Sequence, residues 1–165
     1  MLAYLCGPIE FAPDGGKLWR RKLTPFLHNE LGHLVYDPAE DEKKNLTDEE
    51  AAHFRDWKEA DVERFRRVVR KIIQYDLDIV ENKADYVICC LNGEGAALSS
   101  GGTASELTFA YRRGIPVYLV SDAPVGEISG WMLACADRVF SDVDELKRFL
   151  VDRYGKEKQA PLWRV

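Results

Sequence analysis

Residues Asp85 to Leu91 read Asp-Tyr-Val-Ile-Cys-Cys-Leu, a run that stays apolar instead of alternating with polar positions. A half-exposed strand would show that alternation, whereas a strand buried on both faces is apolar throughout. Such strands are typical of parallel sheets that helices cover on both sides. We therefore expect this run to lie at the centre of an α/β sheet.

Other strand-like runs accompany this one, and helical patterns separate them. The alternation indicates a doubly wound, mostly parallel five-stranded sheet flanked by helices, as in flavodoxin-like and Rossmann-like folds. The expected strands are Leu2 to Cys6, His33 to Tyr36, Asp85 to Leu91, Ile115 to Val120 and Arg138 to Phe140. The expected helices are Lys17 to Leu31, a helical region from Thr47 to about Glu81, the segment from Gly101 to Gly114, and Asp142 to about Arg153. Ala39 to Asn45 is expected to be a loop.

The length of 165 residues suits one domain. We expect an α/β domain over residues 1–155 and a C-terminal tail over residues 156–165. The net charge of -5, with both signs interspersed, provides no basic patch for a nucleic acid polymer. No apolar run approaches the roughly 18 residues of a membrane span, and Met1 leads directly into a strand. We expect a cytoplasmic protein without a membrane partner.

The four cysteines show no CxxC spacing. Cys6, Cys89 and Cys90 lie in apolar strand-like runs, where a thiol is usually a small buried hydrophobic group. Neither a disulfide framework nor a zinc site is indicated, and we expect no metal or redox cofactor.

A glycine pair, Gly101 and Gly102, opens the helix that carries Glu106. Glycine lets the backbone come close to a ligand, and unpaired amides at a helix start point toward whatever binds there. We expect Glu106 in the first turn, where the helix dipole favours an ionised carboxylate, a competent nucleophile or base. Thr103 and Glu106 also have the Thr-x-x-Glu spacing of a capping box, so a purely structural role is the alternative.

The first expected strand ends at Gly7, which opens a loop with Pro8. Ligands bind beyond the carboxyl ends of strands in open parallel sheets, so Tyr4 and Gly7 are candidate site residues by position. Tyr4 fits a core aromatic equally well. Asp76 and Asp78 lie near the end of the long helical region, which should run back toward the same sheet edge as Glu106.

Three motifs occur in order along the chain. They are Tyr4-Leu5-Cys6-Gly7-Pro8, then Asp76-Leu77 before Ala84-Asp85-Tyr86-Val87-Ile88, and Gly102-Thr103-x-x-Glu106 with Ala110 and Gly114-x-Pro116-Val117. Together they resemble the nucleoside 2-deoxyribosyltransferase superfamily, which includes base-exchanging transferases and 2'-deoxynucleoside 5'-monophosphate N-hydrolases. The resemblance covers roughly residues 2 to 140.

The resemblance implies a role for each motif. Glu106 matches the nucleophilic glutamate, Asp76 the aspartate that handles the proton on the base, and Tyr4 a tyrosine that orients the nucleophile. The spacing from Asp76 to Asp85 is longer than in the family by one residue, which leaves Asp78 as the alternative acid. The expected substrate-binding residues are Gly7, Pro8, Ile9, Ser100, Gly102, Thr103 and Ser129.

We therefore expect cleavage of the N-glycosidic bond of a (2'-deoxy)nucleoside or its 5'-monophosphate, with the sugar passed to another base or to water. The reaction passes through an oxocarbenium-like state, which suits one ionised carboxylate under the sugar and one acid near the leaving base. Two alternatives remain. One is a phosphoribohydrolase-type enzyme, which shares a Gly-Thr-x-x-Glu motif, and the other is a non-catalytic nucleotide-binding or sensing domain.

The residues disagree about a 5'-phosphate. Ser100 and Ser129 resemble phosphate-contacting serines of the hydrolases, whereas Glu10 stands in place of their arginine and would repel a phosphate. Lys17 or Arg20 would be the compensating cation, although both are expected on a solvated helix face.

The sheet is small, so the expected pocket over Gly7 and Glu106 is open on one side. A glycosyl-enzyme must be kept from water, so we expect a homo-oligomer that closes the pocket. Residues near Ser129, or the tail through Trp163, would then complete a neighbouring site. The resemblance implies the same assembly.

Overall fold

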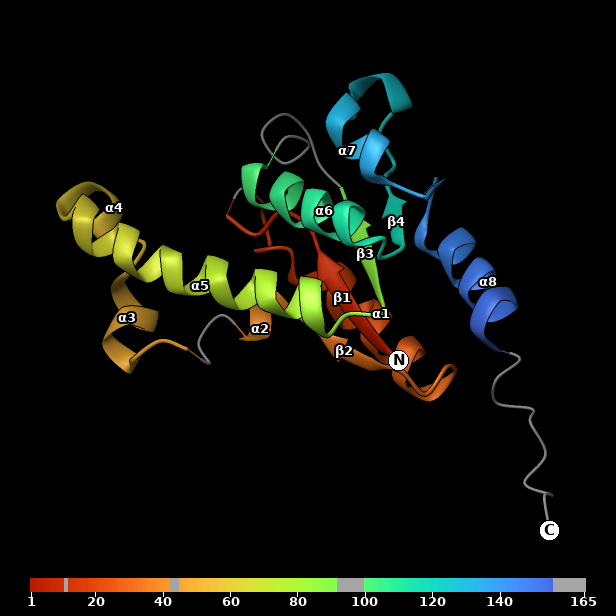
Figure 1. The fold of residues 1–165 in the computed structure, drawn as a ribbon, viewed down its shortest axis with the longest axis horizontal. Helices are drawn as coiled ribbons and strands as arrows, with labels where there is room; N and C mark the ends of the chain where they lie inside the picture. The colour runs from red at the N-terminus through yellow and green to blue at the C-terminus, as the bar shows by residue number, and fades with distance from the viewer. Residues whose placement is uncertain (11, 42–44, 92–99, 156–165) are drawn as a thin grey trace, which may run out of the picture.

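The structure is a computed structural model that describes residues 1–10, 12–41, 45–91 and 100–155. Within these residues five strands form one sheet in the order β2-β1-β3-β4-β5, and every neighbouring pair is parallel. The strands are β1 (Leu2–Cys6), β2 (Leu34–Tyr36), β3 (Tyr86–Cys90), β4 (Val117–Val120) and β5 (Arg138–Phe140) (Figure 1). The expected α/β sheet is confirmed, with β3 at its centre and parallel pairing throughout.

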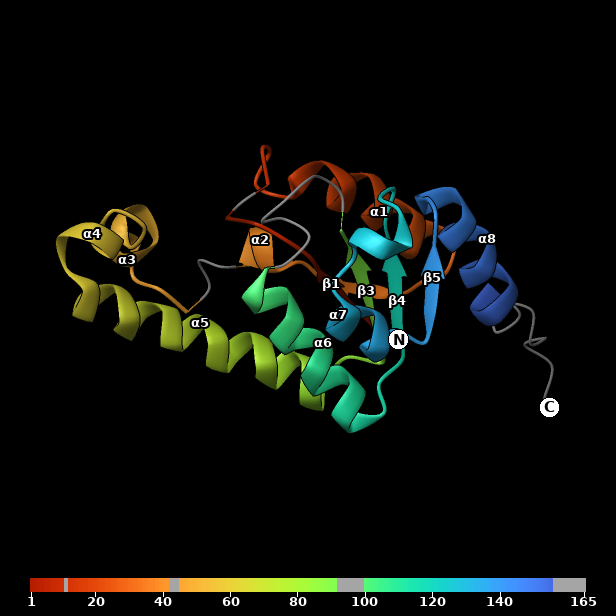
Figure 2. The same ribbon diagram turned by 90° about the horizontal axis from the view of Figure 1, so that it is seen from above.

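Helices cover both faces of the sheet, as the apolar run of β3 predicts (Figure 2). On one face lie α1 (Lys17–Asn29) and α8 (Val143–Tyr154). On the other lie α5 (Val62–Asn82), α6 (Gly101–Arg113) and α7 (Gly130–Cys135). Each layer buries its own apolar cluster against the sheet, which is the doubly wound arrangement.

Strand β1 divides its side chains between the two layers. Ala3 and Leu5 lie in the cluster with α1 and α8, whereas Tyr4 and Cys6 lie in the cluster with α5, α6 and α7. This is the two-residue period of a strand, and all of these side chains are fully buried. Tyr4 and Cys6 therefore face the helix that carries Glu106.

The expected helical region from Thr47 to about Glu81 is divided into several helices. Thr47 forms the capping box with Glu50 that its spacing predicts. The helices that follow are α3 (Asp48–His53), α4 (Trp57–Ala60) and α5. Asp61 separates α4 from α5, because its carboxylate accepts a hydrogen bond from the Arg64 amide at 3.0 Å and starts a new helix there. Helices α3 and α4 lie at the end of α5 that projects beyond the sheet (Figure 1). We call residues 48–73 the arm.

Other boundaries differ from expectation. The short helix α2 (Pro38–Asp41) occupies part of the expected loop, because Asp37 accepts from the Ala39 amide and Pro38 suits the first helical position. Helix α7 and a 3-10 helix (Val125–Glu127) were not expected. The tail, with Trp163, lies outside the described residues. No helix among the described residues is long and apolar enough to cross a membrane.

Arg20 is fully buried, so the expectation of a solvated helix face is wrong for this residue. Its guanidinium donates to the backbone carbonyls of Leu5, Gly7 and Gly16 at 2.7–3.3 Å. It also pairs with the Asp37 carboxylate at 3.2 Å. The carbonyls converge here because β1 ends and its loop turns back into α1. A buried cation is tolerated because its donors are used, and Arg20 is thereby unavailable to a ligand phosphate.

We predict that Arg20→Met lowers the free energy of unfolding by about 3–5 kcal/mol, since it leaves the half-buried Asp37 and the carbonyls without their donor. Urea denaturation measures the loss. The control is Arg21→Met in the same helix, where the side chain is 68% exposed, and there we expect a change below about 0.5 kcal/mol. Equal effects of the two substitutions would contradict a structural role for the buried network.

Candidate active site

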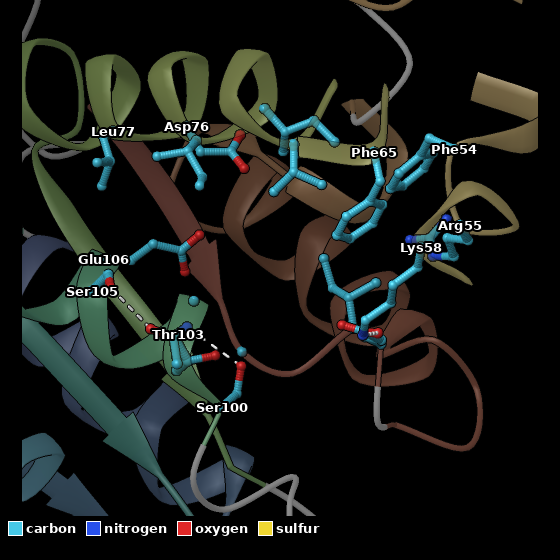
Figure 3. Close-up of a pocket in the computed structure, with 18 of the residues that line it drawn as sticks. Phe54, Arg55, Lys58, Phe65, Asp76, Leu77, Ser100, Thr103, Ser105 and Glu106 are labelled. Atoms are coloured by element: carbon cyan, nitrogen blue, oxygen red, sulfur yellow. Dashed lines mark hydrogen bonds and ion pairs between the residues drawn. The ribbon is translucent and has the colours of Figure 1, made fainter. Parts of the chain in front are cut away.

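A cavity of about 670 Å³ opens between the loop after β1, the N-terminal end of α6 and the facing side of α5 (Figure 3). Gly7 from the β1 loop, Thr103 from α6 and Asp76 from α5 each contribute to its wall. Open α/β sheets bind ligands at this position, beyond the carboxyl end of a strand. The volume lies within the usual range of small-molecule sites.

Glu106 lies deeper in α6 than expected. The helix begins at Gly101 after the N-cap Ser100, whose hydroxyl accepts from the Thr103 amide at 3.5 Å. Glu106 is therefore in the second turn, not the first. The alternative of a capping box between Thr103 and Glu106 is wrong for the same reason, because Ser100 occupies the cap position.

Both carboxylate oxygens of Glu106 accept hydrogen bonds from β1. The Tyr4 hydroxyl donates to Oε1 at 2.8 Å, and the Cys6 thiol donates to Oε2 at 2.8 Å. The Tyr4 ring is fully buried and stacks on Tyr36, with ring centroids 5.2 Å apart. The two alternatives for Tyr4 are thus both realised, since its ring packs in the core and its hydroxyl reaches Glu106.

Burial raises the pKa of Glu106 above its ordinary value, while the hydrogen bonds from Cys6 and Tyr4 and the charge of Arg20 act in the opposite direction. The helix dipole has little influence on this carboxylate, because the effect fades beyond the first turn and Glu106 lies in the second. The side chain is partly buried and lines the cavity, so burial and access to the cavity coexist here. The anion therefore depends on its hydrogen-bond donors.

Asp76 reaches the same cavity from α5. Figure 3 shows the carboxyl groups of Asp76 and Glu106 pointing into one space from facing walls. The Tyr36 hydroxyl donates to Asp76 Oδ1 at 2.8 Å. Asp78 is exposed, pairs with Lys83 at 3.1 Å and does not line the cavity. Of the two aspartates that the sequence left open, Asp76 is the one that lies opposite Glu106.

The expected substrate-binding residues divide into two groups. Those in the cavity wall are Gly7, Ile9, Ser100, Gly102 and Thr103. Pro8 is buried beside the wall, and Ser129 is the N-cap of α7, outside the described lining. Gly7 has φ 150°, and a side chain there would meet the Cys90 carbonyl oxygen at 2.6 Å. Only glycine lets the β1 loop pass this close to the sheet.

Sequence reasoning missed the apolar wall of the cavity, which the arm supplies. Phe65, Val69 and Ile72 follow one another along α5 and lead to Asp76. Phe54 stacks on Phe65, with ring centroids 6.4 Å apart and an interplanar angle of 10°. The available signal was the helical spacing of these apolar residues with Asp76, which the many charges of the same segment obscure.

The end of the cavity away from Glu106 carries charged side chains (Figure 3). The Lys58 ammonium lies 2.6 Å from Oε1 of Glu10, and the Arg55 guanidinium lies 4.5 Å from the Phe54 ring centroid. Among the described residues, Lys58 is thus the cation that contacts Glu10.

These groups suit acid–base and nucleophilic chemistry. Two carboxyl groups in different environments face one cavity, which is the arrangement that a displacement with a nucleophile and an acid requires. In the part of the chain that the structure describes, no cluster of His, Cys, Asp and Glu could hold a metal ion.

Comparisons with known proteins bear on the family and the fold. Two of the solved structures that share the fold serve as examples. A 2-deoxyribosyltransferase from the psychrotolerant bacterium Bacillus psychrosaccharolyticus is 22% identical, with a TM-score of 0.57 over 89% of this chain and 90% of that chain. A 2-desoxiribosyltransferase from Leishmania mexicana is 17% identical, with a TM-score of 0.57 over 93% of this chain and 98% of that chain. No curated protein sequence matches significantly. The family model described as nucleoside 2-deoxyribosyltransferase matches residues 3–134, and the chain belongs to that family.

Proposed function

We propose that the protein cleaves the N-glycosidic bond of a 2'-deoxynucleoside or its 5'-monophosphate and passes the sugar to a second base or to water. The observation that carries this proposal is the pair of carboxyl groups, Glu106 and Asp76, which face one cavity from opposite walls. Family membership supports the substrate class. It leaves the phosphoribohydrolase alternative without support.

In the proposed mechanism, Glu106 attacks C1' of the sugar as the bond from C1' to the base nitrogen breaks. Tyr4 orients the attacking carboxylate through its hydrogen bond to Oε1. Asp76 donates a proton to the base, so the base leaves as a neutral molecule. The product is an ester between Glu106 and C1'. A second base or a water molecule then attacks C1', which frees Glu106, and its surplus proton returns to Asp76.

We propose further that a 5'-phosphate would lie toward Lys58, which lines the cavity and pairs with Glu10. Lys58→Met should then lower kcat/KM for a 5'-monophosphate by about tenfold more than for the nucleoside, the size of one charged hydrogen bond. The control is Lys71→Met, which removes a cation of α5 that pairs with Glu50 outside the cavity. An equal loss of kcat/KM for the 5'-monophosphate and the nucleoside would mean that Lys58 only pairs with Glu10 and does not bind a phosphate.

We predict that Glu106→Gln reduces turnover by roughly a thousandfold or more while the fold persists, because an amide is no nucleophile. The assay follows base release from a panel of nucleosides and 5'-monophosphates by chromatography, with and without a second base. Exchange that needs the second base would identify a transferase, and release without it a hydrolase. Glu127→Gln serves as the control, because it makes the same change at an exposed glutamate. Full activity of a folded Glu106→Gln protein would refute the role of Glu106 as the nucleophile. A wild-type protein without activity would favour the alternative of a non-catalytic nucleotide-binding domain.

A separate prediction concerns the proton on the leaving base. Asp76→Asn should slow cleavage by about a hundredfold for bases that leave poorly and less for bases that leave easily, because general acid catalysis matters most for poor leaving groups. Asp78→Asn is the matched control, since this neighbour on α5 is exposed and outside the cavity wall. Rates measured across a series of bases give the comparison. A larger effect at Asp78 would move the role of acid to that residue.

We propose that the active unit is a homo-oligomer. Ser129 lies outside the cavity lining of its own chain, so a second copy would bring it to the site. Exposed apolar side chains lie near it on α6 and α7: Tyr111 is 63% and Trp131 64% exposed, and Trp131 donates to Thr108 at 2.7 Å. Such groups are typical of subunit contacts. A fully active monomer in light scattering would contradict the assembly.

A further inference from the structure

Cys6 makes a contact with Glu106 that a structural cysteine does not need. Cys6 and Tyr4 lie two residues apart on β1, so both face α6, and each meets one oxygen of the Glu106 carboxylate. The Cys6 side chain is fully buried and is not part of the cavity lining. A substrate in the cavity therefore does not touch the thiol, and any effect of Cys6 on the reaction must pass through Glu106.

The distances decide where the thiol proton points. Cys6 has one proton to donate and two acceptors nearby. The sulfur lies 2.8 Å from Oε2 of Glu106 and 3.9 Å from the Thr103 carbonyl oxygen. The carboxylate is both the closer and the charged acceptor, and hydrogen bonds to charged acceptors are the stronger ones. The thiol therefore donates to Glu106.

The thiol also keeps its proton. Burial raises the pKa of Cys6 well above its ordinary value, and the neighbouring Cys89 on β3 and the charge of Glu106 raise it further. Burial likewise raises the pKa of Tyr4. Two neutral donors thus surround one carboxyl group, and Glu106 is the member of this cluster that ionises first.

We propose that Cys6 is a positioning residue for the nucleophile: its thiol holds Oε2 of Glu106 while Tyr4 holds Oε1, which fixes the orientation of the carboxylate and favours its ionised form. This inference rests on the proposed role of Glu106. Without the thiol the carboxylate would have one donor in place of two, and it would rotate more freely about its last bond. A protonated or misdirected carboxyl group is a poor nucleophile.

Other groups around Glu106 also act on its charge. Arg20 on α1 favours the anion by its positive charge. Asp76 on α5 lines the same cavity and is the titratable group that faces Glu106 from that helix. Cys89 on β3 is the strand partner of Cys6 in register. A substitution at Cys6 leaves all of these groups in place, so its effect on the titration of Glu106 reports the missing thiol.

The alternative is that Cys6 only fills space in the core, as buried cysteines commonly do. In that case Cys6→Ala would lower stability and leave the proton affinity of Glu106 unchanged. The two possibilities therefore differ in the pH dependence of Glu106, which a space-filling role does not affect.

The test compares variants that remove or keep the donor. Cys6→Ala removes it, Cys6→Val removes it while keeping the volume, and Cys6→Ser keeps a donor. The control Cys90→Ala removes a buried thiol from β3 on the opposite face of the sheet. NMR follows the carboxyl resonance of Glu106 across pH in each full-length protein, with Glu106→Gln identifying the signal. kcat and KM are measured over the same range.

We expect Cys6→Ala and Cys6→Val to move the Glu106 titration and the acid limb of kcat/KM to higher pH, because a donor that favours the anion is gone. We expect kcat to fall about tenfold, the size of one hydrogen bond to a charged group, with KM nearly unchanged. Cys6→Ser should return both quantities toward wild type, and Cys90→Ala should match wild type.

An unchanged Glu106 titration in both Cys6→Ala and Cys6→Val would overturn the proposal, and so would an equal shift in Cys90→Ala. If Cys6→Ala does not fold, the volume-keeping Cys6→Val decides. A wild type without turnover on any nucleoside or monophosphate would instead refute the proposed function. The titration would still show whether Cys6 holds the carboxylate, so the two failures are distinguishable.

Discussion

The carboxylate of Glu106 faces the cavity and is held there by hydrogen bonds from a single strand. That arrangement requires Tyr4 and Cys6 on the same face of β1, which the two-residue period of a strand provides. It also requires α6 to begin at Gly101, so that its second turn passes over β1. Arg20 completes the support from the other side, since it holds the carbonyls of Leu5 and Gly7 that flank Cys6. The site therefore depends on the end of β1 as much as on the helix that carries Glu106.

Much of the fold was predictable because local patterns agreed with the tertiary structure. The apolar run of β3 indicated a covered parallel sheet, and β1 and β5 have the predicted bounds. The failures have physical causes. Asp61 divides a helix whose charges suggested one continuous element, since its carboxylate caps the new helix. Arg20 is buried because carbonyls from the end of β1 and from the loop before α1 converge on it, and the helical pattern of α1 does not report this convergence.

The site was predicted in part. The sequence suggested Tyr4, Asp76 and Glu106, and in the structure Asp76 and Glu106 line one cavity while Tyr4 donates to Glu106 from the core. The ionisation of Glu106 was not predictable, because a local argument from the helix dipole misses the burial that the sheet imposes. The apolar wall was missed for a similar reason. In the sequence, Phe65 and Val69 stand among many charged residues of one helix, and only the structure shows that they line the cavity.

Two parts of the molecule form the cavity, and they differ in how far their amino-acid sequence can change. Around Glu106 every neighbour is shared with the sheet core, so a change there disturbs both folding and chemistry. The wall from Phe65 to Ile72 belongs to the arm, which projects beyond the sheet and shares no strand with it (Figure 1). That wall needs only to be apolar and of suitable size. Substitutions in the arm can therefore change the shape of the cavity while the hydrogen bonds around Glu106 stay as they are.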